Sequence, residues 1–161
     1  MSRNIYFEPR KSIEQVEESA DFAPKFDEND LIPVCTTDAF SGELLMHGYM
    51  NAEALKKTID TGEAFYFSRS RKVLWHKGKS SGLTQIVREI RIDDDQDCIW
   101  LRVEVKGDAS CHVGYRSCFY RSIPFGDELE GQDKVHLKFE EMDKVFDPKD
   151  IYGDAPNPTV L

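Results

Sequence analysis

The segment 99–105 carries the clearest two-residue hydrophobic period in the chain. Ile99, Leu101, Val103 and Val105 alternate with Trp100, Arg102 and Glu104. This alternation is typical of a strand that buries one face of a sheet. Isoleucines in the same phase across 85–92 predict a neighbouring strand. The apolar face of such a sheet must be covered, either by a helix or by a second subunit.

Shorter signals place the remaining elements. Strands at 31–35 and 43–46, joined by a turn, predict a hairpin. The main helix is expected at 52–61, because Asn51 suits the N-cap and Gly62 suits the position after the last turn. Further expected elements are a short helix near 12–19, strands at 63–67 and 118–123, and a polar loop at 68–82. We therefore predict an α+β fold with a small, mostly antiparallel sheet and one main helix.

Charge divides the chain into three parts. The net charge is −9 over 161 residues, with eight acids and four bases in 1–30 and ten acids and four bases in 125–161. The middle, 31–124, sums to +1. We expect a polar N-terminal arm at 1–28, one folded domain at 29–124 and an acidic C-terminal extension at 125–161. Acidic flanks favour solubility, and no long basic stripe indicates binding to nucleic acid.

Apolar runs and cysteines indicate the compartment. The sequence has no run of eighteen apolar residues, so we expect no membrane span. The first residues lack the apolar stretch of a secretory signal, and we expect a cytoplasmic protein. In that compartment the four cysteines are expected to be thiols or metal ligands and not disulfides.

Two cysteines and a histidine lie in one glycine-containing segment. Cys111 and Cys118 could turn their sulfurs to one point, because Gly107 and Gly114 allow the backbone to bend. His112 could ligate a metal or transfer a proton. The spacing of the cysteines is looser than in zinc fingers. It is equally compatible with two buried cysteines beside a surface histidine.

An acidic run precedes the strand at 99–105. On a strand-like backbone, Asp93, Asp95 and Asp97 would share one face and Asp94 would point to the other. Such clustered carboxylates suit a hard divalent cation. The alternative interpretation is a solvated acidic turn between two strands.

The segment 68–82 is basic and rich in serine and glycine. Arg69 and Arg71 offer paired donors for a phosphate, and Trp75 could stack on a base or fill the core. The glycine and lysine spacing of a Walker loop is absent. An exposed basic loop anchored by Trp75 is the alternative.

Taken in order, these segments resemble the phosphoribosyl-AMP cyclohydrolase family of histidine biosynthesis over residues 31–123. The matching residues include the following: Met46, Tyr49 to Leu55, Thr61, Gly62, Tyr66, Ser68 to Arg71, Leu74, Trp75, Lys77, Gly78, Ser80 to Gly82, Gln85, the aspartate run, Cys111, His112, Gly114 and Ser117 to Phe119. The resemblance implies an intertwined homodimer with zinc sites at the subunit interface and a magnesium-type site on the aspartates. The implied reaction is hydrolysis of the N1–C6 bond in the adenine ring of phosphoribosyl-AMP.

The resemblance also implies roles for individual residues. His112 would transfer a proton during the reaction. Zinc or another transition metal would bind Cys111 and Cys118, and Mg²⁺ would bind Asp93, Asp95 and Asp97. The residues expected to bind substrate are Ser68, Arg69, Ser70, Arg71, Trp75, Lys77, Ser80, Ser81 and Gln85.

Three positions depart from the family pattern. Asp94 stands where the family has a cysteine that binds zinc, Lys79 stands where a glutamate is usual, and Val113 replaces a threonine. Cys111 and Cys118 would form a site for zinc or another soft metal, which we call the soft site. Either Asp94 itself or Cys98 could complete it. Cys98 would need a bend, because four strand residues span roughly 13 Å, and a carboxylate would favour harder metals such as iron or manganese. The pairing of a lost cysteine with a nearby new one favours a relocated site.

Three functions follow from these patterns. The first is a phosphoribosyl-AMP cyclohydrolase with an altered metal set. The second is a related hydrolase for another purine or amidine, with Lys79 reshaping the pocket. The third is a non-catalytic metal-binding dimer, which the presence of His112 and both loop arginines makes less favoured.

Overall fold

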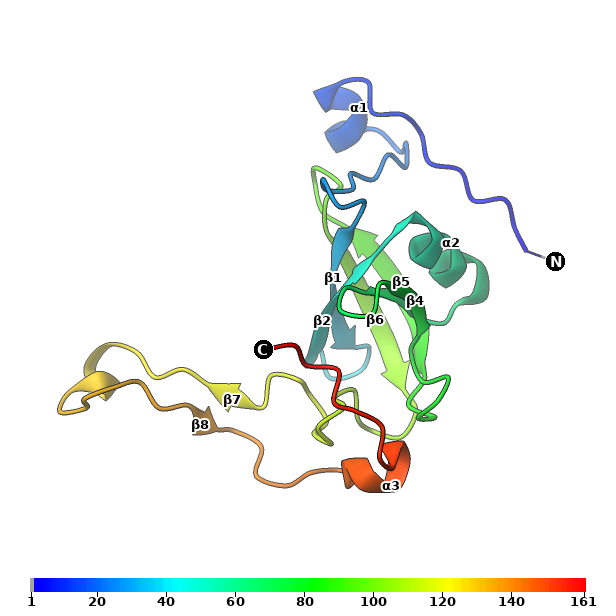
Figure 1. The fold of residues 1–161 in the computed structure, drawn as a ribbon. Coiled ribbons are helices and arrows are strands. Elements are labelled where there is room, and N and C mark those ends of the chain that lie inside the picture. The colour runs from blue at the N-terminus through cyan, green and yellow to red at the C-terminus, as the bar shows by residue number, and fades with distance from the viewer. Residues whose placement is uncertain (1) are drawn as a thin grey trace.

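The computed structural model describes residues 2–161 and has an α+β fold (Figure 1). Its helices and strands, in chain order, are α1 (Ile13–Glu18), β1 (Ile32–Asp38), β2 (Leu44–Met50), α2 (Ala52–Thr61), β3 (Phe65–Ser68), β4 (Val73–His76), β5 (Gln85–Ile92), β6 (Ile99–Val105), β7 (Arg121–Ser122), the 3-10 turn η1 (Gly126–Leu129), β8 (Lys138–Phe139) and α3 (Pro148–Tyr152). None of the helices in residues 2–161 has the length and apolar character needed to cross a bilayer.

The main sheet has four strands in the order β2-β1-β6-β5. Its outer pairs are antiparallel, and β1 and β6 run parallel. In β6 the side chains of Ile99, Leu101 and Val103 are buried, and Trp100 on the opposite face is 37% exposed. The alternation in 99–105 therefore places the core as predicted, and the predicted fold class is confirmed.

Helix α2 forms where its capping residues predict it. The Asn51 side chain accepts a hydrogen bond from the Ala54 amide at 2.9 Å. Gly62 adopts the left-handed conformation (φ 74°) and donates its amide to the Thr58 carbonyl, which ends the helix. Ala54, Leu55 and Thr58 form the buried face of the helix. The helix packs mainly against β3 of the β3–β4 hairpin and also contacts β2 of the main sheet (Figure 1).

The predicted loop at 68–82 is wrong in part. Residues Val73–His76 form β4, which pairs with β3 in an antiparallel hairpin and sets Trp75 opposite Tyr66. The physical reason is that Val73, Leu74 and Trp75 suit a pleated, half-buried surface, although their neighbours are polar. At 118–123 the predicted strand is shorter than expected, because only Arg121 and Ser122 pair, with β8.

A chain of buried polar groups crosses the core. The Tyr66 hydroxyl lies 2.7 Å from Thr36 Oγ1 on β1 and donates to Gln85 Oε1 on β5 at 2.7 Å. Gln85 Nε2 in turn lies 3.4 Å from Ser110 Oγ and 3.2 Å from Met46 Sδ. All five side chains are buried. Buried polar groups are tolerated when they bond to one another, and here they join the sheet to the segment that follows β6.

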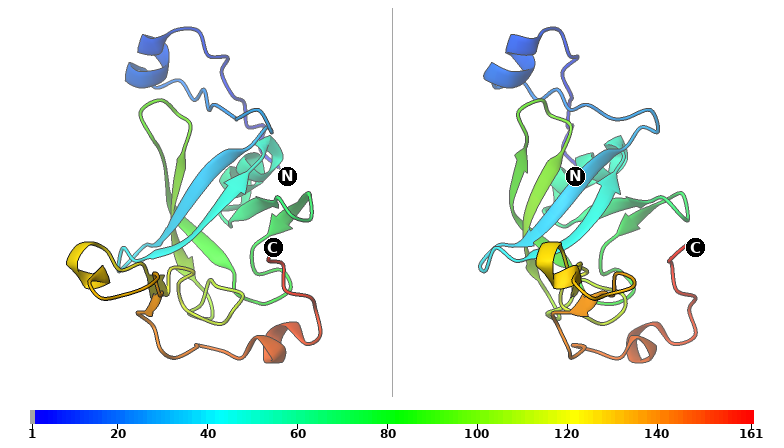
Figure 2. Two further views of the ribbon diagram at one scale, coloured as in Figure 1. Left: turned by 60° about the vertical axis from the view of Figure 1, so that its left-hand side comes forward. Right: turned by 90° about the vertical axis from the view of Figure 1, so that its left-hand side faces the viewer.

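Two flanks leave the sheet at opposite ends. The N-terminal flank carries α1 and packs Phe7, Phe22 and Phe26 against the core. The β7–β8 arm projects from the body near the other end (Figures 1 and 2). The chain then returns, so that the Val145 amide donates to the Gly114 carbonyl at 2.7 Å.

We expect Tyr66→Phe to lower the free energy of unfolding by about 1–3 kcal/mol, because it removes one hydroxyl and leaves Thr36 and Gln85 with unpaired buried groups. Urea denaturation followed by fluorescence would measure the change. Tyr6→Phe is the matched control, since Tyr6 is 66% exposed. Equal stabilities of the two variants would contradict the proposed role of the buried chain.

Candidate active site

The segment between β6 and β7 folds back on itself as a compact loop. The Cys111 amide donates to the Tyr115 carbonyl at 3.3 Å, and the Gly114 amide donates to the Cys111 carbonyl at 3.0 Å. The Cys118 amide donates to the Leu45 carbonyl of β2 at 2.7 Å, which ties the end of the loop to the sheet. These bonds bring the sequence-predicted pair Cys111 and Cys118 together.

Gly114 is required where the C-terminal flank crosses this loop. Its backbone has φ 110°, a conformation that favours glycine. A Cβ atom at this position would lie 2.3 Å from the Phe146 carbonyl oxygen. The C-terminal flank therefore closes directly over the cysteine loop.

The two thiols have very different proton affinities. A hydrogen bond from the Cys118 thiol lowers the pKa of Cys111 to about 6, although burial opposes this shift. The same hydrogen bond and burial raise the pKa of Cys118. This shift favours a thiolate on Cys111, and a thiolate is the form that binds soft metals.

Lys77 lies close to this pair. The residue is 3% exposed, and its ammonium group donates to the Ser110 carbonyl at 2.8 Å. The Trp75 ring lies 5.0 Å from Lys77 Nζ. Burial lowers the pKa of Lys77, while Cys118 and Cys111 act in the opposite direction. A charged Lys77 therefore favours a thiolate at the cysteine pair, and a thiolate there favours the charged form of Lys77.

His112 follows Cys111 and is half-buried. Its Nε2 atom is buried and has no hydrogen-bond partner among the described residues. Unpaired buried polar atoms are rare in folded proteins and often belong to catalytic groups. The arrangement suits a group that transfers a proton to or from a bound molecule.

The aspartate run forms a tight turn between β5 and β6, as in the second of the two arrangements considered, and not a strand. Gln96 adopts a left-handed conformation (φ 58°), which reverses the chain. Even so, Asp93, Asp95 and Asp97 converge, with one carboxylate oxygen from each within 4.8 Å of the others. The hydrogen bond with the Asp93 carboxylate raises the pKa of Asp97 to about 6. A divalent cation would relieve this crowding of negative charge.

The candidate third ligands of the soft site lie elsewhere in the chain. Cys98 neighbours Cys35, and burial with the nearby Cys35 raises its pKa to about 11. Among residues 2–161, no third histidine, cysteine or carboxylate gathers with Cys111 and Cys118. Asp94 and Cys98 precede β6, whereas Cys111 follows it, and the seven residues of β6 span roughly 20 Å.

The basic segment presents two exposed arginines. The Arg69 guanidinium lies 4.2 Å from the Tyr49 ring centre, and that of Arg71 lies 5.8 Å from the Trp75 ring centre. Within the described chain neither arginine forms an ion pair. Both are therefore free to bind an anion, and stacking on the rings limits their motion.

The other predicted substrate residues divide by burial. Ser68 and Ser70 lie with the arginines, and Ser68 Oγ accepts a hydrogen bond from Arg71 Nε at 3.3 Å. Ser80 and Ser81 lie in the turn that follows β4, where Ser81 Oγ accepts from the Leu83 amide. Two other members of the predicted set, Lys77 and Gln85, are buried beside the cysteine loop. The serines thus lie at or near the surface, whereas Lys77 and Gln85 are buried next to the cysteine loop.

Sequence patterns missed two residues that hold this site. Ser110 receives the bonds of both Lys77 and Gln85, and Gln96 shapes the aspartate turn. Ser110 carries no pattern of its own, because its partners lie 33 and 25 residues away. For Gln96 the sequence did offer a signal, because an amide side chain interrupts the run of aspartates.

Both candidate metal sites have the donor chemistry that their ions require. The cysteine loop offers two sulfurs, one of them readily ionised, which suits zinc or another soft transition metal. The aspartate turn offers three converging oxygens, which suits a hard cation such as Mg²⁺.

Comparisons with known proteins agree on one family. The sequence model described as "Phosphoribosyl-AMP cyclohydrolase" matches residues 46–120. A phosphoribosyl-AMP cyclohydrolase of Rhizobium leguminosarum bv. trifolii (strain WSM2304) is 51% identical over 154 residues, which cover 95% of this chain and 99% of the relative. That of Bradyrhizobium sp. (strain ORS 278) is 55% identical over 131 residues, covering 81% and 97%. That of Rhodopseudomonas palustris (strain BisA53) is 52% identical over 139 residues, covering 86% and 92%.

We expect a thiolate to appear in metal-free protein with a pKa of about 6. Ultraviolet absorbance at the thiolate band, followed against pH, would measure it. In Cys118→Ala the donor to Cys111 is lost, so the pKa should rise toward the ordinary thiol value of about 8.5. Cys35→Ala is the control and should leave the low transition in place. A transition that persists unchanged in Cys118→Ala would contradict the assigned hydrogen bond.

Proposed function

Because the chain belongs to the phosphoribosyl-AMP cyclohydrolase family, we propose that it hydrolyses the N1–C6 bond in the adenine ring of phosphoribosyl-AMP during histidine biosynthesis. The observation that carries this proposal is the cysteine loop, where a thiol pair, a buried lysine and an unpaired histidine nitrogen meet. We place this activity in the cytoplasm, where such thiols stay reduced.

Cys111 and Cys118 would hold zinc or another transition metal, and Asp93, Asp95 and Asp97 would hold Mg²⁺. The soft metal, when bound, lowers the pKa of water and so supplies a nucleophile near neutral pH. The low pKa of Cys111 supports metal binding at that pH, because ligands must lose their protons before they bind.

His112 would move the proton in this reaction. Water adds its oxygen to C6, the N1–C6 bond breaks, and N1 gains a proton. A half-buried imidazole beside the soft site can take the proton from water and return it to N1. Its Nε2 atom is the free atom available for this transfer.

We propose that the soft site is completed by a second copy of the chain. Asp94 and Cys111 lie at opposite ends of β6, so a ligand from the same chain cannot reach the thiols. In a twofold dimer, the aspartate turn of each copy can meet the cysteine loop of the other, which gives two equivalent composite sites. Asp94 is the favoured third ligand, because the Cys98 thiol is partly buried next to Cys35 in its own chain.

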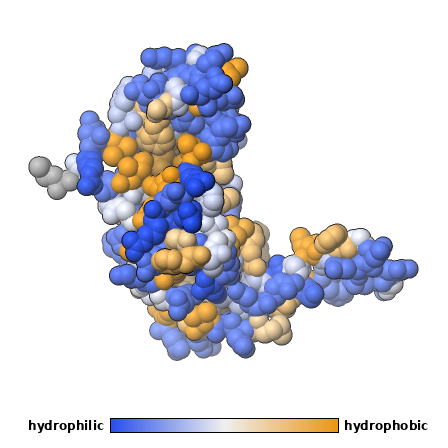
Figure 3. Space-filling view, turned by 180° about the vertical axis from the view of Figure 1, so that it is seen from behind, coloured by the Kyte–Doolittle hydropathy of each residue, from blue (hydrophilic) through white to orange (hydrophobic). Residues whose placement is uncertain are grey.

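The projecting arm supports a dimer. Apolar side chains lie along it in the space-filling view (Figure 3). In the part of the chain that forms the arm, Ile123 is 68% exposed, Phe125 is 77% exposed and Val135 is 53% exposed. A two-stranded hairpin is at best marginally stable alone in water. A second copy would cover these side chains while it brings its aspartate turn to the cysteine loop.

The exposed arginines would hold the phosphorylated arms of the substrate. Arg69 and Arg71 carry guanidinium groups that bind phosphate oxygens in pairs. The serines of the same segment, Ser68, Ser70, Ser80 and Ser81, can add neutral donors. Trp75 would contribute an aromatic surface at the edge of this segment.

The proposal is tested by metal content and phosphoribosyl-AMP turnover in one purified preparation. We expect about one soft metal ion per chain and turnover that follows the absorbance change on ring opening. His112→Asn should keep the metal and lose roughly 100-fold or more in kcat. Bound metal without turnover in the native protein would contradict the proposal and favour another purine or amidine substrate.

A second prediction concerns the arginines. Arg69→Ala should weaken substrate binding by about 1.5–3 kcal/mol if this side chain holds a phosphate, which raises KM more than tenfold. Arg88→Ala is the matched control, because Arg88 is an exposed arginine on β5 that pairs with Glu104 on β6. Steady-state kinetics would measure both, and an unchanged KM in Arg69→Ala would remove the role of Arg69.

A further inference from the structure

Gln96 is the buried member of an otherwise acidic turn. Its side chain is 5% exposed, whereas its neighbours Asp95 and Asp97 are not buried. An acidic turn that only needs solvation has no reason to bury an amide, because a buried amide must find partners for its donors and acceptor. The partners of Gln96 therefore indicate what the turn is attached to.

All of these side-chain partners belong to the N-terminal flank. Gln96 Nε2 donates to the Val16 carbonyl at 2.8 Å and to the Asp21 carbonyl at 3.1 Å. Its Oε1 accepts from the Ala23 amide at 2.8 Å. The backbone adds a fourth bond, from the Lys25 amide to the Gln96 carbonyl at 2.7 Å. The side chain is thus fully bonded to a segment more than 70 residues away.

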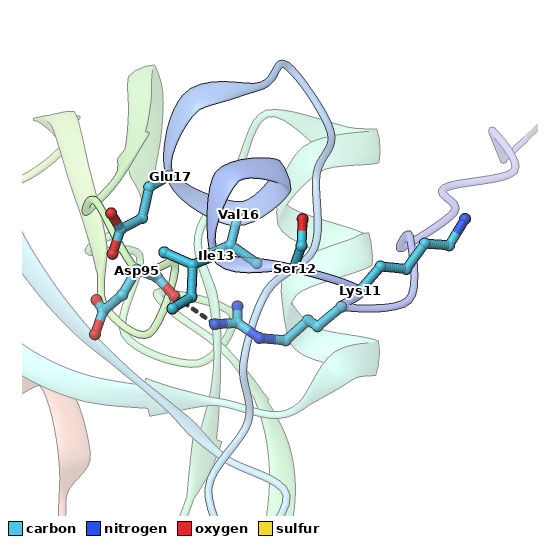
Figure 4. A pocket seen from close by; sticks show the side chains of 7 residues that line it. Lys11, Ser12, Ile13, Val16, Glu17 and Asp95 are labelled. Carbon is cyan, nitrogen blue, oxygen red and sulfur yellow. Dashed lines mark hydrogen bonds between the residues drawn. The ribbon is translucent and has the colours of Figure 1, made fainter.

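Arg10, also in the N-terminal flank, makes a second hydrogen-bonded link to the same turn. The Arg10 guanidinium donates to the Asp95 carbonyl at 2.9 Å and to the Ala23 carbonyl at 2.6 Å. Figure 4 shows the bond to Asp95 beside the side chains of Ile13, Val16 and Glu17. The depression between them has a volume of about 350 Å³ and is lined by α1 and Asp95.

The N-terminal flank is also attached to the rest of the protein through contacts that do not involve the aspartate turn. Phe7 and Phe22 pack edge to face at 5.2 Å, and both pack against the core. The Arg3 amide donates to Asp60 at 2.8 Å on α2. A flank anchored in this way can act as a fixed support for the turn.

The turn needs such a support because its carboxylates repel one another. Three of them lie within 4.8 Å, so a turn held only by its own bonds would spread apart before a cation arrived. Holding ligands in place before binding raises metal affinity, and loss of a supporting residue typically lowers it 10- to 100-fold.

We propose that Gln96 is a positioning residue through which the N-terminal flank fixes the aspartate turn and sets its affinity for a divalent cation. This inference rests on the proposed function in one respect, the assignment of Asp93, Asp95 and Asp97 as the hard-ion site. The flank lies outside residues 46–120, which the family model matches. The flank therefore adds a contribution to metal binding that the matched segment lacks.

The test measures Mn²⁺ binding to the full chain with its soft site loaded, from the electron paramagnetic resonance signal of free Mn²⁺. Gln96→Met keeps the side-chain length and removes all three side-chain bonds. We expect its Mn²⁺ affinity to fall roughly 10-fold or more, with the soft metal retained. The Mg²⁺ concentration for half-maximal turnover should rise by a similar factor, and kcat at saturating Mg²⁺ should be restored. Gln132→Met, at an exposed glutamine, is the matched control.

A second variant keeps the test decisive if Gln96→Met does not fold. Arg10→Met removes the hydrogen bond to the Asp95 carbonyl from an exposed position, and Lys11→Met, at the exposed neighbour, is its control. We expect Arg10→Met to weaken Mn²⁺ binding several-fold. Native affinity in Arg10→Met and in any folded Gln96→Met would overturn the inference.

A separate variant distinguishes failure of the inference from failure of the proposed site. Asp93→Asn should weaken Mn²⁺ binding in the otherwise native chain. If it does not, the aspartates are not the hard-ion site, and the inference falls with that assignment. If it does, while Gln96→Met binds Mn²⁺ normally, only the inference is overturned.

Discussion

The buried hydrogen-bond chain from Thr36 through Tyr66 and Gln85 to Ser110 is the constraint on which the site depends. It starts on β1, passes the β3–β4 hairpin and β5, and ends at the residue before Cys111. Because each member is buried, each must keep its partner or lose stability. The chain therefore fixes the position of the cysteine loop relative to the sheet. Lys77 adds to this arrangement, because its ammonium group donates to the Ser110 carbonyl.

Both candidate metal loops are also held by the flanks of the chain. The C-terminal flank donates to Gly114 in the cysteine loop, and the N-terminal flank binds Gln96 in the aspartate turn. The two loops lie at opposite ends of β6. In one chain the cysteine loop and the aspartate turn are therefore far apart. A twofold dimer would bring the cysteine loop of each copy to the aspartate turn of the other.

The fold was predictable where local chemistry decides it. The alternation in 99–105 predicted β6, and Asn51 with Gly62 predicted the ends of α2, because caps and side-chain period are local properties. The candidate site residues were predicted largely through the family resemblance. Their arrangement in space could not be predicted from the sequence. The aspartates converge in a turn, which was one of two arrangements considered, and Cys98 lies beside Cys35.

The remaining differences arise from contacts between distant residues. Lys77 lies in the segment 68–82, which was predicted as a polar loop, but Lys77 is buried and its bond to Ser110 spans 33 residues. Asp94 was a candidate ligand because it stands where the family has a cysteine that binds zinc. The seven residues of β6 separate Asp94 from Cys111, so the sequence alone did not give the distance between the two residues within one chain.

The most direct test of the proposed active site mixes two variants that are each expected to be inactive. Asp94→Ala keeps the thiols, and Cys111→Ser keeps the carboxylate. After the two variants are unfolded together and refolded, each mixed dimer would contain one intact composite site. Random pairing should then restore about a quarter of the native turnover. Mixed dimers that are isolated by two different affinity tags and remain inactive would contradict a site shared between two chains.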